Sequence, residues 1–152
     1  MTGTQRRRLG RGLLAAYLAC AAFIFFWPYG SVIHRLNLDL WLALRKVGLP
    51  RWITPDHTEQ IFNFLAFAIP VVIALAVFPG LRVWHVVVAG VVASMTIELV
   101  QGYLLDARNM DWLDFAANSL GVVAGAAAAV FLRRAETSQR VPKGQHDQDE
   151  LV

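Results

Sequence analysis

The stretch Glu98–Gly121, ELVQGYLLDARNMDWLDFAANSLG, joins two long apolar runs through a short polar connection. It places acidic, basic and amide side chains directly beside runs of Leu, Val and Ala. About 20 apolar residues in a helix are enough to cross a hydrocarbon core about 30 Å thick. The stretch therefore predicts the end of one membrane-spanning helix, a turn, and the start of the next.

The composition of the whole chain agrees with a membrane protein. Of its 152 residues 57% are hydrophobic and only 16% are charged, and the mean hydropathy is +0.48. A soluble domain of this size is less apolar than that. The sequence predicts an all-α polytopic protein with short hairpins and four transmembrane helices, at about Gly12–Tyr29, Gln60–Phe78, Val83–Leu105 and Trp112–Leu132.

The segments around these spans carry weaker patterns. The arginines before the first span also suit a cleaved signal peptide, but no small-x-small site follows the apolar run, so an uncleaved span is predicted. Over residues 36–47, apolar side chains recur at helical spacing, which predicts an interfacial amphipathic helix; an ordinary anchored loop is the alternative. The expected organisation is a basic cytoplasmic segment (1–11), a membrane domain (12–134) and a disordered cytoplasmic tail (135–152).

The basic residues indicate topology and not a nucleic-acid partner. They lie at the ends of apolar runs and form no basic stripe with interleaved aromatics. Of the 14 Lys and Arg residues, nine fall on the side of both chain termini and five on the other side. The positive-inside rule then places both termini in the cytoplasm and the connection around Arg108 outside, in a multi-pass protein of the cell membrane. Cys20, the one cysteine, is expected to be a small packing residue.

Polar residues recur at helical spacing near the outer ends of three spans. Steps of three and four residues put them on one face of each helix, so they are expected to meet at one level of the membrane. Arg108 is the natural partner of these acids, because a guanidinium pairs with carboxylates and phosphates alike. The predicted ligand-binding set is Glu59, Asn63, Glu98, Gln101, Arg108, Asp111, Asp114 and Asn118.

Two other readings of these residues stay open. Polar side chains can simply hold membrane helices together, and Gly121-x-x-x-Gly125 is a small-residue motif for close helix packing. Alternatively Glu98 and Asp114 are candidate catalytic groups, since a protonated carboxyl beside an ionised one is the arrangement of general acid–base chemistry. No spacing of metal ligands is evident, so neither a metal site nor a cofactor is predicted.

The charge of the set restricts the ligand. With all groups ionised, four carboxylates face one arginine, so a bare phosphate would be repelled. The ligand is therefore expected to be cationic, or a divalent cation bridges it, or one or two of the acids carry a proton.

The run from Glu98-x-x-Gln101 through Arg108-x-x-Asp111-x-x-Asp114-x-x-x-Asn118 to Gly121 and Gly125 resembles the VanZ-like family of small bacterial membrane proteins. A looser match, Glu59-x-x-x-Asn63 with Phe67 and Pro70, lies upstream, so that the resemblance covers about residues 13–132.

The resemblance implies a multi-pass bacterial membrane protein, and the named member of the family is associated with resistance to teicoplanin-type glycopeptide antibiotics. The leading hypothesis is a protein that binds or modifies a cell-envelope component, such as a lipid-linked cell-wall precursor, and contributes to resistance. The alternatives are an enzyme that hydrolyses or transfers a lipid head group, and a structural or assembly partner without catalysis.

Overall fold

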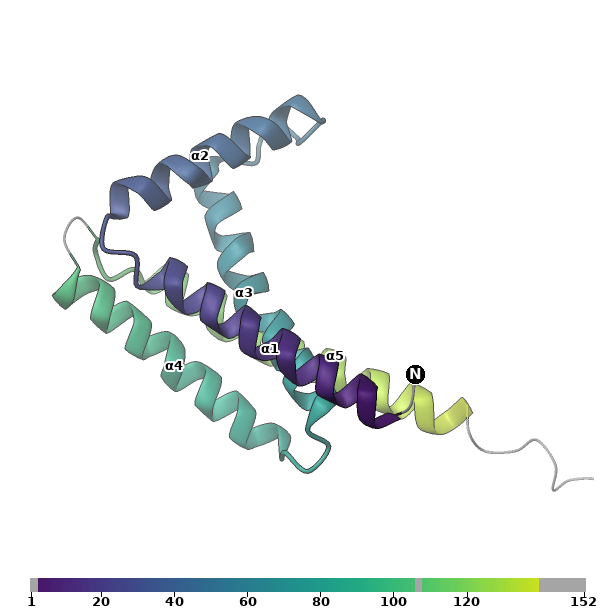
Figure 1. The fold of residues 1–152 in the computed structure, drawn as a ribbon. Coiled ribbons are helices and arrows are strands. Elements are labelled where there is room, and N and C mark those ends of the chain that lie inside the picture. The colour runs from purple at the N-terminus through teal and green to yellow at the C-terminus, as the bar shows by residue number, and fades with distance from the viewer. Residues whose placement is uncertain (1–2, 106–107, 140–152) are drawn as a thin grey trace, which may run out of the picture.

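The computed structural model describes residues 3–105 and 108–139, and this part of the chain is built from five helices without any strand (Figure 1). The helices are α1 (Gly3–Phe25), α2 (Gly30–Lys46), α3 (Pro55–Val77), α4 (Val83–Leu104) and α5 (Trp112–Gln139). Four of them, α1, α3, α4 and α5, are long and apolar enough to cross a membrane. The all-α fold with four spans is therefore confirmed.

The helix α2 differs from the four spans in length and position. It has 17 residues, and none of them is buried. Figure 1 shows α2 at a steep angle to the long axes of α1, α4 and α5. The helix predicted at about residues 36–47 is thus present and begins earlier, at Gly30.

The boundaries of α3 and α5 also differ from the sequence prediction. Thr54 caps α3, because its side chain accepts a hydrogen bond from the backbone of His57 at 3.3 Å and Pro55 occupies the first helical turn. The helix therefore begins at Pro55 and not at Gln60. At the other end of the chain, α5 continues to Gln139, past the predicted start of the tail, and residues 140–152 lie outside the described part.

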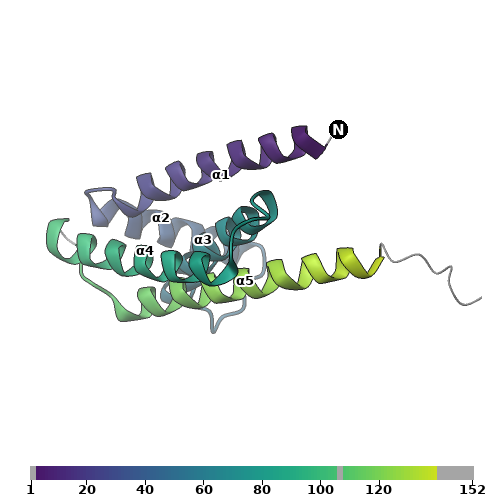
Figure 2. The same ribbon diagram turned by 90° about the horizontal axis from the view of Figure 1, so that it is seen from below.

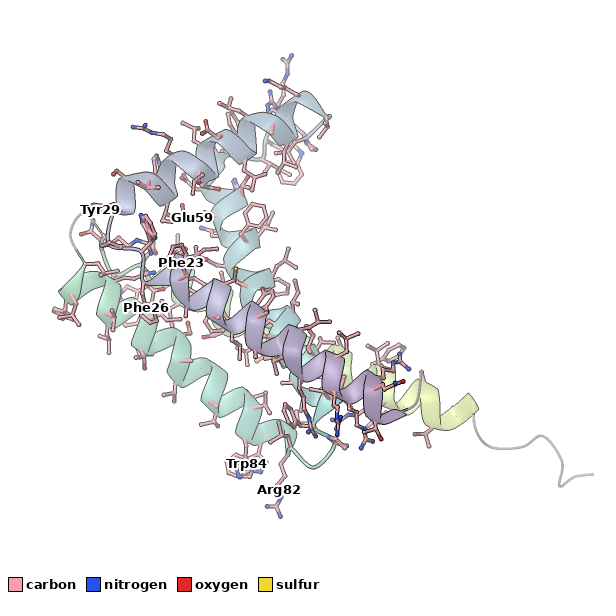
Figure 3. The ribbon with its side chains drawn as sticks, viewed as in Figure 1. Phe23, Phe26, Tyr29, Glu59, Arg82 and Trp84 are labelled. Atoms are coloured by element: carbon pink, nitrogen blue, oxygen red, sulfur yellow. The ribbon has the colours of Figure 1, made fainter. Side chains whose placement is uncertain are left out.

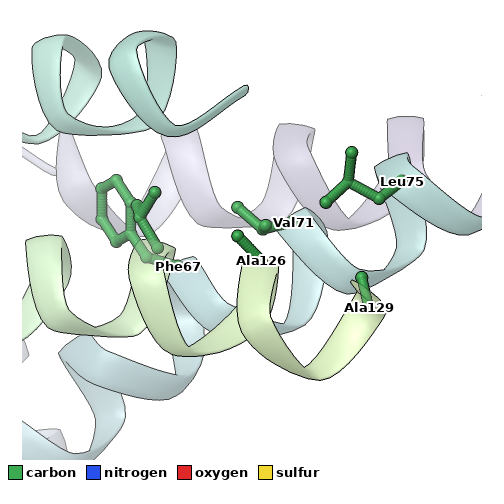
Figure 4. Packing of buried hydrophobic residues seen from close by; sticks show 6 residues of the cluster. Phe67, Val71, Leu75, Ala126 and Ala129 are labelled. Carbon is green, nitrogen blue, oxygen red and sulfur yellow. The ribbon is translucent and has the colours of Figure 1, made fainter. Parts of the chain in front are cut away.

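The helix α3 lies in the centre of the bundle, between α1 and α5 (Figure 2). Its most extensive packing is with α5, where Phe67, Val71 and Leu75 meet apolar side chains of α5 (Figure 4). Leu75 and Val122 are completely buried. On the α5 side this core consists of small side chains, since its members there are Val122, Ala126 and Ala129.

The glycines of α5 allow this close packing. A Cβ atom at Gly121 would collide with the backbone oxygen of Phe64, and one at Gly125 with that of Ala68. Both glycines thus lie directly against the backbone of α3, which is the usual role of small residues between membrane helices.

Aromatic side chains lie at both ends of the bundle (Figure 3). Phe23, Phe26 and Tyr29 lie where α1 meets α2, and Glu59 lies toward this end of the molecule. Arg82 and Trp84 lie at the opposite end, at the turn between α3 and α4. Exposed aromatic groups at both ends are typical of the two interfaces of a membrane.

Candidate functional site

Six of the eight predicted site residues line one cavity of about 550 Å³. They come from three helices and the connection between α4 and α5: Glu59 and Asn63 of α3, Glu98 and Gln101 of α4, Arg108, and Asp114 of α5. The antiparallel arrangement of α4 and α5 explains how they meet, because the end of α4 and the start of α5 lie at the same level. Their convergence makes this end of the bundle the candidate site.

Glu98 is held by the turn that follows its own helix. Its side chain is 1% exposed, and Oε2 accepts a hydrogen bond from the backbone N–H of Asp111 at 3.0 Å. A charge-assisted hydrogen bond to a backbone amide is one way to keep a carboxylate inside a membrane protein. Glu98 therefore has a structural partner and also lines the cavity.

Arg108 and Gln101 share one acceptor, the backbone oxygen of Phe25 at the end of α1. Gln101 Nε2 donates to it at 2.9 Å, and Arg108 Nη1 donates at 3.2 Å. The last carbonyls of a helix have no partner within the helix and carry partial negative charge, so they accept such donors readily. These two contacts tie α1 to the polar end of the bundle.

The nearby carboxylates affect the pKa of Arg108 electrostatically, without direct contact. Burial lowers the pKa of Arg108, whereas the negative charges of Glu59, Asp114 and Glu98 raise it. In the described part of the chain, however, no carboxylate lies within 4 Å of its guanidinium nitrogens. The arginine is thus surrounded by acids without a direct ion pair, and its close hydrogen bond is to Phe25.

Asn63 of α3 and Asp114 of α5 line the cavity from two different helices. Glu59 lies one turn before Asn63 on α3, and its carboxylate has no hydrogen-bond partner within the described residues. Glu59 is half-buried and lines the cavity, so its carboxylate faces the space that a ligand would occupy.

Asp111 and Asn118 do not line the cavity. Asp111 is exposed, and its Oδ1 accepts the backbone N–H of Leu113 at 2.7 Å, which caps the start of α5. Asn118 is completely buried one turn deeper than Asp114, and neither its Nδ2 nor its Oδ1 has a hydrogen-bond partner within the described residues. Both residues therefore lie next to the cavity without lining it.

The sequence did not indicate the apolar wall of the cavity. This wall comes mainly from α1, α2 and α3 and includes Ile24, Leu36, Leu40, Leu65 and Ile69. Cys20, expected to be a packing residue, is exposed and belongs to the same wall. The apolar spacing of residues 36–47 was a usable signal, but it did not reveal that Leu36 and Leu40 face a cavity.

The described residues contain no group of three His, Cys, Asp or Glu side chains arranged to hold a metal ion. A divalent cation in the cavity would therefore need oxygen ligands from the bound molecule as well as from the acids.

Fold and site together define a multi-pass helical membrane protein with ionisable groups around a cavity inside the bundle. A family model described as VanZ/LLP1 matches residues 14–133 of the chain. The chain therefore belongs to the VanZ-like family, which confirms the resemblance found in the sequence. No curated protein and no solved structure matches it.

Proposed function

We propose that this VanZ-like protein binds a lipid-anchored component of the cell envelope. The observation that carries the proposal is a single cavity of about 550 Å³ with an apolar wall and an ionisable end. This volume falls within the range of about 300–1,000 Å³ that small-molecule sites occupy. A molecule with a polar head and a hydrocarbon chain matches both parts of such a cavity.

The apolar wall suits a hydrocarbon chain because much of it is open to the surroundings. Ile24 is 51% exposed and Ile69 is 41% exposed, although both line the cavity. In a bilayer such exposed side chains of α1 and α3 face lipid, so a chain could enter from the side. The polar head group then reaches Arg108, Glu59 and Asp114 at the ionisable end of the cavity.

The proposal places this site at the outer leaflet. Its support is the excess of Lys and Arg on the side of both termini, which by the positive-inside rule is cytoplasmic. Lipid-linked cell-wall precursors are one class of amphiphile with a polar head and a hydrocarbon chain. A contribution to glycopeptide resistance would follow if the bound component is such a precursor or a target of the antibiotic.

The test is to identify the amphiphile that stays with the protein. The full chain is extracted from bacterial membranes in a mild detergent, and bound lipids are measured by mass spectrometry for the wild type, Arg108→Ala and Arg82→Ala. Arg82 is the matched control because it is exposed at the opposite end of the bundle. Loss of an amphiphile from Arg108→Ala alone supports the proposal, provided that both variants insert and melt like the wild type. Identical lipids in all three proteins would overturn it.

Hydrolysis or group transfer on the bound head group is a second candidate, because Glu98 and Asp114 line the same cavity from neighbouring helices. Two such carboxyl groups could act as acid and base. A catalytic role predicts that Asp114→Asn keeps the bound lipid but forms no product from it. If the wild type leaves the bound lipid unchanged over prolonged incubation, binding without catalysis is favoured. A purely structural role predicts instead that Glu98 and Asp114 can be replaced by apolar residues of similar size without loss of phenotype.

A further inference from the structure

The polar end of the cavity has an excess of negative charge. Three carboxylates, Glu59, Glu98 and Asp114, line it together with one guanidinium, that of Arg108. With all four ionised, the lining carries two more negative than positive charges. Close to an apolar wall this excess is poorly screened, so a purely anionic head group would meet net repulsion there.

The hydrogen bonds within the site leave specific groups for a ligand. Glu98 accepts the backbone N–H of Asp111, but the Glu59 carboxylate has no hydrogen-bond partner within the described residues. This carboxylate can accept several hydrogen bonds from a donor in the cavity. Arg108 uses Nη1 for Phe25, which leaves further N–H donors of its five for another acceptor.

Resting on the proposed function, we infer that the bound lipid carries a primary ammonium group next to its phosphate. The ammonium supplies three N–H donors and a positive charge to Glu59 and Asp114. The phosphate oxygens accept the remaining N–H groups of Arg108. An amine-bearing phospholipid head group thus complements both the acids and the arginine of this site. A plain anionic phosphodiester complements the arginine alone.

The position of the lipid's hydrocarbon chain follows from the position of its head group. From Arg108 and Glu59 the cavity extends along the apolar wall between α1 and α3, past Cys20 and Ile69. The binding mode is therefore a head group at the end of α4 and a hydrocarbon chain along α1. A large side chain at position 20 blocks this path.

The experiment measures lipid selectivity by native mass spectrometry. The purified full chain is equilibrated in detergent micelles that contain equal amounts of dioleoyl phosphatidylethanolamine and dioleoyl phosphatidylglycerol. We expect the wild type to retain the ethanolamine lipid with a preference of about tenfold or more, the scale of one charged hydrogen bond. Glu59→Gln should lose most of this preference. Asp39→Asn should keep it, because Asp39 is an exposed acid of α2 that does not line the cavity.

A second pair of variants separates the two proposals. Cys20→Trp places a large ring in the apolar part of the cavity, in the path of the hydrocarbon chain, and should abolish retention of both lipids. Leu18→Trp, on the exposed surface of α1 outside the cavity, should not. Melting temperatures of all variants check that they remain folded. If both lipids are retained equally and Cys20→Trp abolishes both, the inference about the ammonium fails and the proposed function stands. If Cys20→Trp changes nothing, both fail. Equal retention of dioleoyl phosphatidylcholine, which lacks N–H donors, would also overturn the inference.

Discussion

Replacing Gly125 by alanine is expected to destabilise the bundle through one added methyl group. A Cβ atom at this position would lie 2.5 Å from the backbone oxygen of Ala68, whereas ordinary contacts begin at 3.4 Å. The backbones of α3 and α5 would therefore have to separate by about 0.9 Å at this point. Neither neighbour can move aside by a rotamer change, because the blocking atom belongs to the main chain.

The magnitude follows from the cost of overpacking and the gain in helix propensity. Inserting a methyl group into a well-packed interior costs about 1–3 kcal/mol. Alanine offsets up to about 1 kcal/mol of that, because it is the better helix former. The expected net loss of about 1–2 kcal/mol lowers the ratio of folded to unfolded protein by a factor of about 5–30.

The assay is unfolding of the purified protein in mixed micelles of a mild detergent and increasing SDS, followed by loss of helix and by tryptophan fluorescence. Gly12→Ala is the matched control, since Gly12 also lies in a spanning helix but has nothing within 4 Å of the added Cβ. That variant should be neutral or slightly more stable than the wild type. Equal midpoints for Gly125→Ala and Gly12→Ala would refute the close packing of α3 on α5.

Three further predictions use the same unfolding assay. Thr54→Ala removes the cap of α3 and should cost about 1 kcal/mol, whereas Thr54→Ser should cost little, because serine caps equally well. Asn118→Leu should stabilise the protein by about 1–2 kcal/mol, since it removes two buried amide atoms without partners in the described residues; a loss of stability would show that Asn118 has a partner. Glu98→Gln should cost less than about 1 kcal/mol, because an amide oxygen can still accept the Asp111 N–H, whereas Glu98→Leu should cost about 1–3 kcal/mol. Equal losses for these two variants would mean that the charge of Glu98, and not its hydrogen bond, stabilises the turn.

The spans and the level at which polar groups gather could be predicted because both depend on local periodicity. Runs of about 20 apolar residues predict spanning helices, and steps of three and four residues predict a shared face. The arrangement of residues on that face was less predictable. Asp111, Asp114 and Asn118 share one side of α5, but each step of three or four residues also moves about 5 Å along the helix axis. As a result Asp114 reaches the cavity, while Asp111 caps the helix and Asn118 lies deeper.

Other features of the site depend on tertiary contacts that leave no pattern in the sequence. The partner of Gln101 and Arg108 is the backbone oxygen of Phe25, and a main-chain atom has no residue signature. The apolar wall depends on where α1 and α2 lie relative to α3. Tyr17 is one of the contacts that fix α1, through a hydrogen bond from its hydroxyl to the oxygen of Ala66 at 3.3 Å. From the sequence alone, Tyr17 and Cys20 are two ordinary members of an apolar run.

The hydrogen bonds of the polar site residues indicate whether these residues do more than hold the helices together. Polar residues that only hold helices together need a partner each and nothing further. Glu98, Gln101 and Arg108 meet that description, since each makes a close hydrogen bond to the backbone. Glu59 does not, because its carboxylate faces the cavity and has no hydrogen-bond partner in the described part of the chain. A carboxylate kept beside an apolar wall in this way is costly to retain, and a ligand that carries hydrogen-bond donors would remove that cost.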